Sequence, residues 1–210
     1  PPSETFSNAM NFLAHALLSG DDADILVGNL MTDFLKPGDA QPQNERIQHG
    51  IAWHYQIDRF MDSHSLVAQS RRRLFGDYRH YSAVLVDIFY DHLLAVNWKQ
   101  FSDVPLEEFA QSTYAALALR REMFPPRMAV VMPHLVADNW LCAYARADGV
   151  LKALGRVQRR QTRGADLMAS WASFEADKPQ FKIEFTEFFP QIVTLQREFL
   201  RGGAKLRNFI

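Results

Sequence analysis

Apolar side chains recur three and four residues apart along almost the whole chain, the spacing that places them on one face of an α-helix. Alternating runs typical of strands are few, and no Asn-Gly or Asp-Gly pair joins two β-rich segments. The pattern therefore predicts an all-α protein. The expected helices cover residues 10–19, 23–35, 44–75, 80–99, 105–122, 126–145, 147–162, 166–177 and 179–200.

Capping and helix-ending residues stand between these ranges. Gly20 ends the first helix, Asp22 can cap the second, and Pro37 stops it.

Because the chain has no repeat, low-complexity segment or long linker, residues 10–210 are predicted to form a single helical domain. Residues 1–9 resemble a linker or vector remainder, with the native start expected at residue 10.

Composition narrows the classes of protein to consider. Of the 210 residues, 48% are apolar and 22% charged, and a formal net charge of -1 gives no reason to expect nucleic acid as a partner. The single cysteine, Cys142, cannot form an intramolecular disulfide and fits a reducing compartment, so we expect a cytoplasmic protein. No apolar run approaches the roughly 20 residues that cross a bilayer, so no membrane partner is expected.

One predicted helix carries metal-type side chains at four-residue intervals. His54, Asp58 and Asp62 therefore share one helical face, where unpaired carboxylates repel unless water or a cation neutralises them. The apolar residues around them favour a lined pocket over a solvated face. The alternative is a charged face whose acids pair with Arg59, Arg71 or Arg72.

A second group of such side chains follows on the next predicted helix. Asp87, Asp91 and His92 stand among isoleucine, phenylalanine and leucine residues. The adjacent Asp91-His92 pair is the reverse of the ligand dipeptide found in dimetal helical hydrolases. A histidine that binds a metal usually donates its other N–H to a carboxylate, so Asp87 is the expected partner of a ligating histidine.

Two further candidates lie nearer the N-terminus. His15 stands in an otherwise apolar helix, and its alternative role is a core histidine that bonds to a backbone carbonyl. Asp33 stands near a helix C-terminus, where the helix dipole opposes a carboxylate. The alternative for Asp33 is an ordinary surface position.

Histidine and aspartate without cysteine form a mixed nitrogen and oxygen ligand set. This set disfavours a structural zinc site and suits Mn, Fe, Mg or catalytic Zn. Such a metal lowers the pKa of bound water and stabilises charge on a phosphate. Because the chain has no nucleophile elbow and no Gly-rich phosphate loop, metal-assisted phosphoester hydrolysis follows more naturally than acyl chemistry.

Basic residues without acids mark residues 149–165, at spacings that keep them on one helical face. These residues are Lys152, Arg156, Arg159, Arg160 and Arg163. A second basic cluster comprises Arg71, Arg72 and Arg73. We interpret the basic face as a dock for an acidic partner, and the alternative is a surface that serves only solubility.

The ordered motifs of the first hundred residues resemble the acyl-carrier-protein phosphodiesterase family, also called holo-ACP hydrolases. They are Met10-Asn11-Phe12-Leu13-Ala14-His15, Gly28-Asn29-Leu30-Met31-Thr32-Asp33-Phe34, the stretch from His54 to Asp62, and the stretch from Asp87 to His92 with Trp98. The resemblance implies an all-α fold distantly related to the HD phosphohydrolases and a divalent cation, typically Mn. It also implies hydrolysis of the phosphodiester between 4'-phosphopantetheine and a serine of holo-acyl carrier protein.

With this resemblance we assign roles to the candidates. The predicted catalytic residues are Asp33, His15 and Asp62, and the predicted metal ligands are Asp33, His54, Asp58, Asp91 and His92. The predicted contacts to the acidic carrier protein are Arg156, Arg159, Arg160, Arg71 and Arg72. Two alternatives stay open: an HD-type nucleotide phosphohydrolase, and a non-catalytic helical protein that binds an acidic partner.

Overall fold

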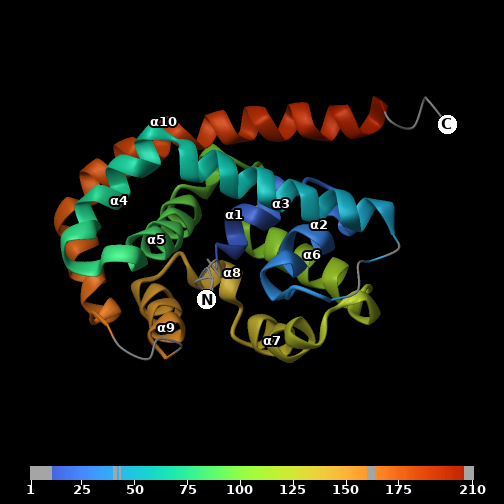
Figure 1. Ribbon diagram of the computed structural model, residues 1–210, viewed down its shortest axis with the longest axis horizontal. Coiled ribbons are helices and arrows are strands. Elements are labelled where there is room, and N and C mark those ends of the chain that lie inside the picture. The colour runs from blue at the N-terminus through green and yellow to red at the C-terminus, as the bar shows by residue number, and fades with distance from the viewer. Residues whose placement is uncertain (1–10, 40–41, 43, 160–163, 206–210) are drawn as a thin grey trace.

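The computed structural model describes residues 11–39, 42, 44–159 and 164–205. Within these ranges the regular secondary structure consists of α-helices and short 3₁₀-helices, which confirms the predicted all-α class. The expected linker at residues 1–9 lies outside the described residues. In chain order the α-helices are α1 Phe12–Leu18, α2 Ala23–Met31, α3 Glu45–Ser63, α4 Ser65–Tyr78, α5 Ser82–Val96, α6 Leu106–Ala118, α7 Pro126–Ala137, α8 Trp140–Ala143, α9 Ala147–Gln158 and α10 Ser170–Lys205 (Figure 1).

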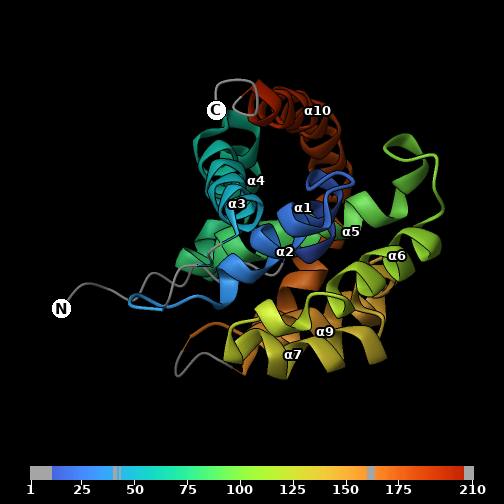
Figure 2. The same cartoon turned by 90° about the vertical axis from the view of Figure 1, so that its right-hand side faces the viewer.

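Helix α5 runs through the middle of the fold, and every residue from Leu85 to Ala95 is buried. Helices α1, α4, α9 and α10 pack against it. Figure 1 shows α10 passing along the top of the molecule and curving down beside α4, while Figure 2 shows α7 and α9 together at the bottom. None of the described helices combines the length and apolar character that crossing a membrane requires.

Helices α2 and α3 touch through their backbones at two glycines. A Cβ atom on Gly28 would lie 2.0 Å from the carbonyl oxygen of Ile47, and one on Gly50 would lie 2.3 Å from that of Ile25. Only glycine permits so close an approach. The contact matters for the site because Asn29 follows Gly28 and His54 lies one turn beyond Gly50.

Two predicted helices are each interrupted in the structure. The helix expected over 44–75 breaks at His64, which adopts an extended backbone and whose ring nitrogen accepts the N–H of Leu66. The helix expected over 126–145 breaks at Asn139, whose left-handed backbone (φ 45°) ends α7 before α8 begins. The His64 ring caps α4 locally, whereas the Asn139 amide bonds to Tyr114 and Glu107 on α6. Hydrophobic periodicity carries neither signal.

The two helices expected over 166–177 and 179–200 are a single helix in the structure. Helix α10 continues through Pro179 and Pro190, although each proline removes one backbone N–H. Its apolar face packs on the core on both sides of Pro190, through Phe185, Phe188 and Ile192. Tertiary packing therefore outweighs the helix-ending tendency of proline here.

Candidate metal centre

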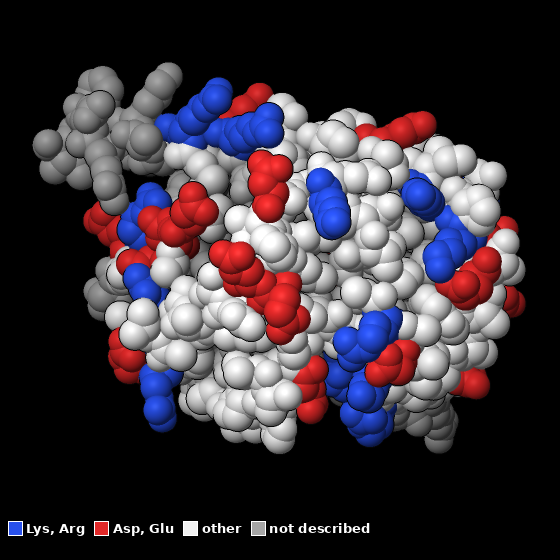
Figure 3. All heavy atoms as spheres, turned by 180° about the vertical axis from the view of Figure 1, so that it is seen from behind, with Lys and Arg blue, Asp and Glu red and all other residues white. Residues whose placement is uncertain are grey.

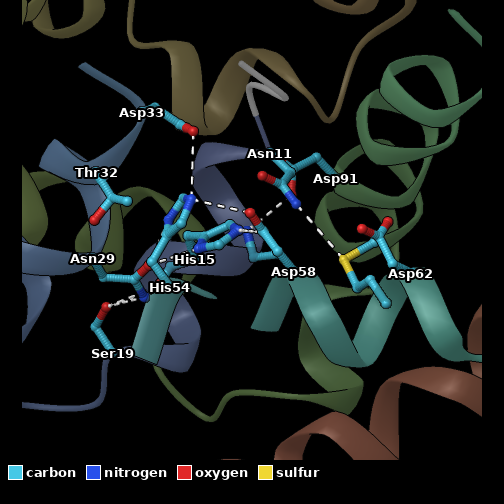
Figure 4. Close-up of polar contacts among 12 residues, drawn as sticks. Asn11, His15, Ser19, Asn29, Thr32, Asp33, His54, Asp58, Asp62 and Asp91 are labelled. Carbon is cyan, nitrogen blue, oxygen red and sulfur yellow. Dashed lines mark hydrogen bonds and ion pairs between the residues drawn. The ribbon is translucent and has the colours of Figure 1, made fainter. Parts of the chain in front are cut away.

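Four of the predicted site residues converge from three neighbouring segments. His15 comes from α1, Asp33 from the 3₁₀-helix η1 (Thr32–Phe34), and His54 and Asp58 from successive turns of α3. Nε2 of His15 lies 3.5 Å from Oδ1 of Asp58, and Nε2 of His54 lies 3.3 Å from Oδ2 of Asp58. The same nitrogen of His54 lies 3.5 Å from Oδ1 of Asp33 (Figure 4).

Three of these residues have a geometry suited to a cation. One ligand atom each from His15, His54 and Asp58 lies within 4.8 Å of the others, the one such group among the described residues. The two histidines are buried, whereas the Asp58 side chain is 30% exposed, so the group is reachable from solvent. Nε2 of His15 is buried without a hydrogen-bond partner in the described part of the chain. Two imidazoles and a carboxylate are thus compatible with a divalent metal.

The amide of Asn29 fixes both histidine rings. Its nitrogen donates to the carbonyl oxygen of His15 and to Oγ of Ser19, at 3.0 Å each. Its oxygen therefore faces Nδ1 of His15 at 2.6 Å and Nδ1 of His54 at 3.2 Å, and it accepts from both. With Nδ1 donating to Asn29 on each ring, both Nε2 atoms point into the cluster and are the ring nitrogens that a cation could use.

Charge coupling across the cluster is strong. Burial alone would lower the pKa of His15, but Asp58 and Asp33 outweigh it and raise the pKa to about 9. Burial would raise the pKa of Asp58, yet the close approach and charges of His15 and His54 hold it well below its usual range. Without a cation, the cluster is thus held together by a protonated histidine and an ionised carboxylate. A divalent ion would replace that proton.

The structure places Asp91 beneath the cluster rather than in it. Asp91 is fully buried on α5, and its two carboxylate oxygens accept the backbone N–H groups of Leu13 and Ala14, at 3.0 and 2.9 Å. It thereby caps the first turn of α1, the turn that leads into His15. Burial raises the pKa of Asp91 to about 7, although the hydrogen bonds from the two N–H groups lower it.

The other predicted residues of α3 and α5 also lie apart from the cluster. His92 points from a different face of α5, where Nδ1 donates to the carbonyl oxygen of Tyr144 at 2.8 Å. Asp62 is exposed, and its carboxylate pairs with Arg71 at 2.8 Å. Asp87 lines a small cavity beside Asp91, and burial raises its pKa to about 8. The metal and catalytic roles expected for these residues stay predictions that this geometry does not support.

Sequence reasoning missed the second layer of contacts around the histidines. Asn29 and Ser19 are both fully buried, and both bond to the carbonyl oxygen of His15. The sequence does carry one signal for Asn29, because it stands among apolar residues of α2 and a buried polar side chain needs hydrogen-bond partners. Its partners, however, come from α1 and α3, and no spacing within the sequence gives them.

The predicted partner contacts fall on two separate helices. Arg71 and Arg72 lie on α4, and Arg71 is engaged by Asp62. Arg156 and Arg159 lie on α9 and at its end, and the Arg156 guanidinium stacks on the Trp140 ring at 3.7 Å from its centre. Arg160 lies outside the described residues.

Comparisons with known proteins agree on one family. The family described as Acyl carrier protein phosphodiesterase matches residues 10–192. The acyl carrier protein phosphodiesterase of Pectobacterium atrosepticum is 30% identical over 189 residues, which cover 90% of this chain and 98% of that protein. The protein of the same name from Serratia proteamaculans is 28% identical over 185 residues, covering 88% and 96%. No solved structure matches the chain. The chain therefore belongs to the acyl carrier protein phosphodiesterase family.

Proposed function

We propose that the protein is a metal-dependent hydrolase that removes 4'-phosphopantetheine from holo-acyl carrier protein. The scissile bond joins the phosphate to a carrier-protein serine, and the products are apo-carrier protein and free 4'-phosphopantetheine. The observation that carries this proposal is the solvent-reachable group of His15, His54 and Asp58. Its chemistry suits phosphodiester cleavage, the activity for which the relatives are named.

Each residue of the cluster has a stated role in this proposal. His15 and His54 hold the metal through Nε2 and Asp58 through its carboxylate, while Asp33 extends the ligand set beside His54. Asn29 keeps both rings in the tautomer that leaves Nε2 free. A bound divalent ion, Mn in the first instance with Mg, Fe or Zn as alternatives, supplies Lewis acidity toward water and the phosphate oxygens.

The residues themselves supply orientation and charge. The ionised Asp58 and the buried histidines are held in place by the fold, which favours stabilisation of charge that develops on phosphate. The exposed edge of Asp58 gives the substrate phosphate a way in. The cytoplasmic location expected from the single cysteine remains a prediction.

The test is an intact-mass measurement on holo-carrier protein. Metal-stripped protein should leave the carrier mass unchanged, and Mn addition should remove the mass of 4'-phosphopantetheine. Persistent holo-carrier protein with fully Mn-loaded protein would support the binding-protein alternative. A matched assay with nucleotides and cyclic nucleotides addresses the HD-type alternative, because preferential nucleotide turnover would displace the carrier protein as substrate.

A further inference from the structure

The exposed cations of the molecule are largely balanced by acids. Seen from behind, Lys and Arg side chains stand in small separate groups, most of them beside acidic side chains (Figure 3). Exposed charge on this face therefore singles out no anion site. A cation that the fold buries is more informative, because burial of a charged side chain costs free energy unless partners compensate for it.

Arg71, on α4, is a largely buried cation of this kind. Its side chain is only 22% exposed, and Nη2 donates to Oδ1 of Asp62 at 2.8 Å. Nε is buried and has no hydrogen-bond partner among the described residues. The Asp62 side chain is 67% exposed, and an ion pair with so exposed a partner contributes little. This pair alone therefore does not account for the burial of the guanidinium.

The contacts of Arg71 place it beside the metal cluster. Its partner Asp62 stands one turn of α3 beyond Asp58, as the close-up shows (Figure 4). Burial raises the pKa of Asp87 to about 8, the charge of Arg71 acts against that rise, and the charge of Asp58 adds to it. Because such charge effects weaken with distance, Arg71 and Asp58 both lie near Asp87. The guanidinium thus borders the cluster from the side of α4.

The acids around Arg71 leave room for an anion. Asp62 accepts from one nitrogen of the guanidinium, which carries five N–H groups in a planar fork. Asp87 keeps its proton at neutral pH because burial raises its pKa, and a neutral carboxyl does not repel a phosphate oxygen. The remaining N–H groups of Arg71 therefore have no competing carboxylate in either residue.

A phosphodiester needs one positive charge beyond those of the proposed metal centre. A divalent ion there would be formally balanced by the carboxylates of Asp33 and Asp58, since the histidines carry no charge when neutral. The diester brings a further negative charge. Guanidinium matches this need, because its fork can donate two parallel hydrogen bonds to phosphate oxygens.

We propose that Arg71 binds the phosphate of the substrate beside the metal centre, through the guanidinium N–H groups that Asp62 does not use. The proposal rests on the proposed function, which supplies the phosphodiester. It moves the role of Arg71 from a contact with the carrier-protein surface to a contact with the group that is cut. Arg72, the next residue of α4, is exposed and takes no part in this contact.

The test measures binding of two small ligands, inorganic phosphate and 4'-phosphopantetheine, by calorimetry at saturating Mn. Arg71→Gln should bind both about 10- to 100-fold more weakly, because it loses charge-assisted hydrogen bonds. Arg71→Lys keeps the charge without the fork and should lose less. The matched control Arg72→Gln makes the same charge change at an exposed neighbouring position and should bind both ligands as the wild type does. Thermal unfolding of each variant verifies that the fold is intact.

The outcomes separate a phosphate contact from other roles of Arg71. Wild-type affinity in Arg71→Gln would overturn the proposal, and equal losses in Arg71→Gln and Arg72→Gln would do so by assigning the effect to surface charge. A parallel loss of Mn affinity in Arg71→Gln would also overturn it, because Arg71 would then act on the metal centre. So would a wild type that binds neither ligand. If the wild type binds phosphate through Arg71 but leaves holo-carrier protein intact, the proposed function fails and the phosphate contact stands.

Discussion

At the scale of single residues, the amide of Asn29 organises the cluster. One oxygen accepts from both histidines, and the two amide hydrogens are used by the His15 carbonyl and Ser19. The amide cannot turn over without losing all of these bonds, so the histidine tautomers are fixed by the fold. Metal sites depend on such supporting bonds nearly as much as on the ligands themselves.

Replacement of Asn29 by alanine should therefore weaken metal binding about 10- to 100-fold. The variant leaves Nδ1 of His15 and His54 without their acceptor, and the rings lose their orientation. Calorimetric titration with Mn, without substrate, measures the effect. Asn11→Ala is the control, because Asn11 is also buried but, within the described part of the chain, its amide donates to the Met61 sulfur at 3.8 Å and not to a histidine. Equal affinities for the two variants would contradict the role of Asn29.

At the scale of helices, the contact between α2 and α3 builds the site. The sequence predicted both helices and placed His54 and Asp58 on one face of α3, because that relation depends only on spacing within a helix. Spacing could not predict that α1 and η1 would bring His15 and Asp33 to the same face, and only the family resemblance grouped them with His54 and Asp58. That convergence depends on the close approach at Gly28 and Gly50 and on the Asp91 cap of α1.

The same physical distinction explains the misplaced candidates. Asp91 and His92 are neighbours in sequence, yet successive residues of a helix point about 100° apart, so one reaches α1 and the other Tyr144. Asp62 continues the four-residue spacing of α3 one turn beyond Asp58, but it is exposed and pairs with Arg71. Four-residue spacing predicts which residues share a helical face, but it does not tell how many of them reach the site.

Gly28→Ala should destabilise the protein by about 3 kcal/mol or more, because the added Cβ would overlap the Ile47 carbonyl and force α2 and α3 apart. Metal affinity should fall with it, since Asn29 moves with α2. Gly76→Ala is the control: a Cβ there meets nothing within 4 Å, and alanine in a helix should stabilise by about 0.5–1 kcal/mol. Urea unfolding measures both. A Gly28→Ala variant as stable as the wild type would refute the close-contact account.

At the scale of the whole molecule, the fold holds the proposed metal ligands in a charge-coupled state, and this predicts a pH dependence. Without metal, the raised pKa of His15 contributes stability that is fully present below pH 6.5 and lost as pH rises through about 9. A cation can bind Nε2 only after that proton leaves. Metal affinity should therefore rise about tenfold per pH unit up to about pH 9 and then level off.

Calorimetry in buffers of different ionisation enthalpy measures this directly, because it reports both the affinity and the proton released. The stability of the chelated protein, followed by urea unfolding, should move in the opposite direction over the same pH range. A metal affinity that does not change between about pH 6.5 and about pH 9 would mean that metal binding does not displace a proton from His15.

The most direct test of the metal centre compares two carboxylates one turn apart on α3. Asp58 lies within reach of both histidines, whereas Asp62 is exposed and paired with Arg71. The rate of 4'-phosphopantetheine release from holo-carrier protein, at saturating Mn, should fall by orders of magnitude in Asp58→Asn and stay near the wild-type rate in Asp62→Asn. The reverse result, or equal rates for the two variants, would contradict the placement of the active centre at His15, His54 and Asp58.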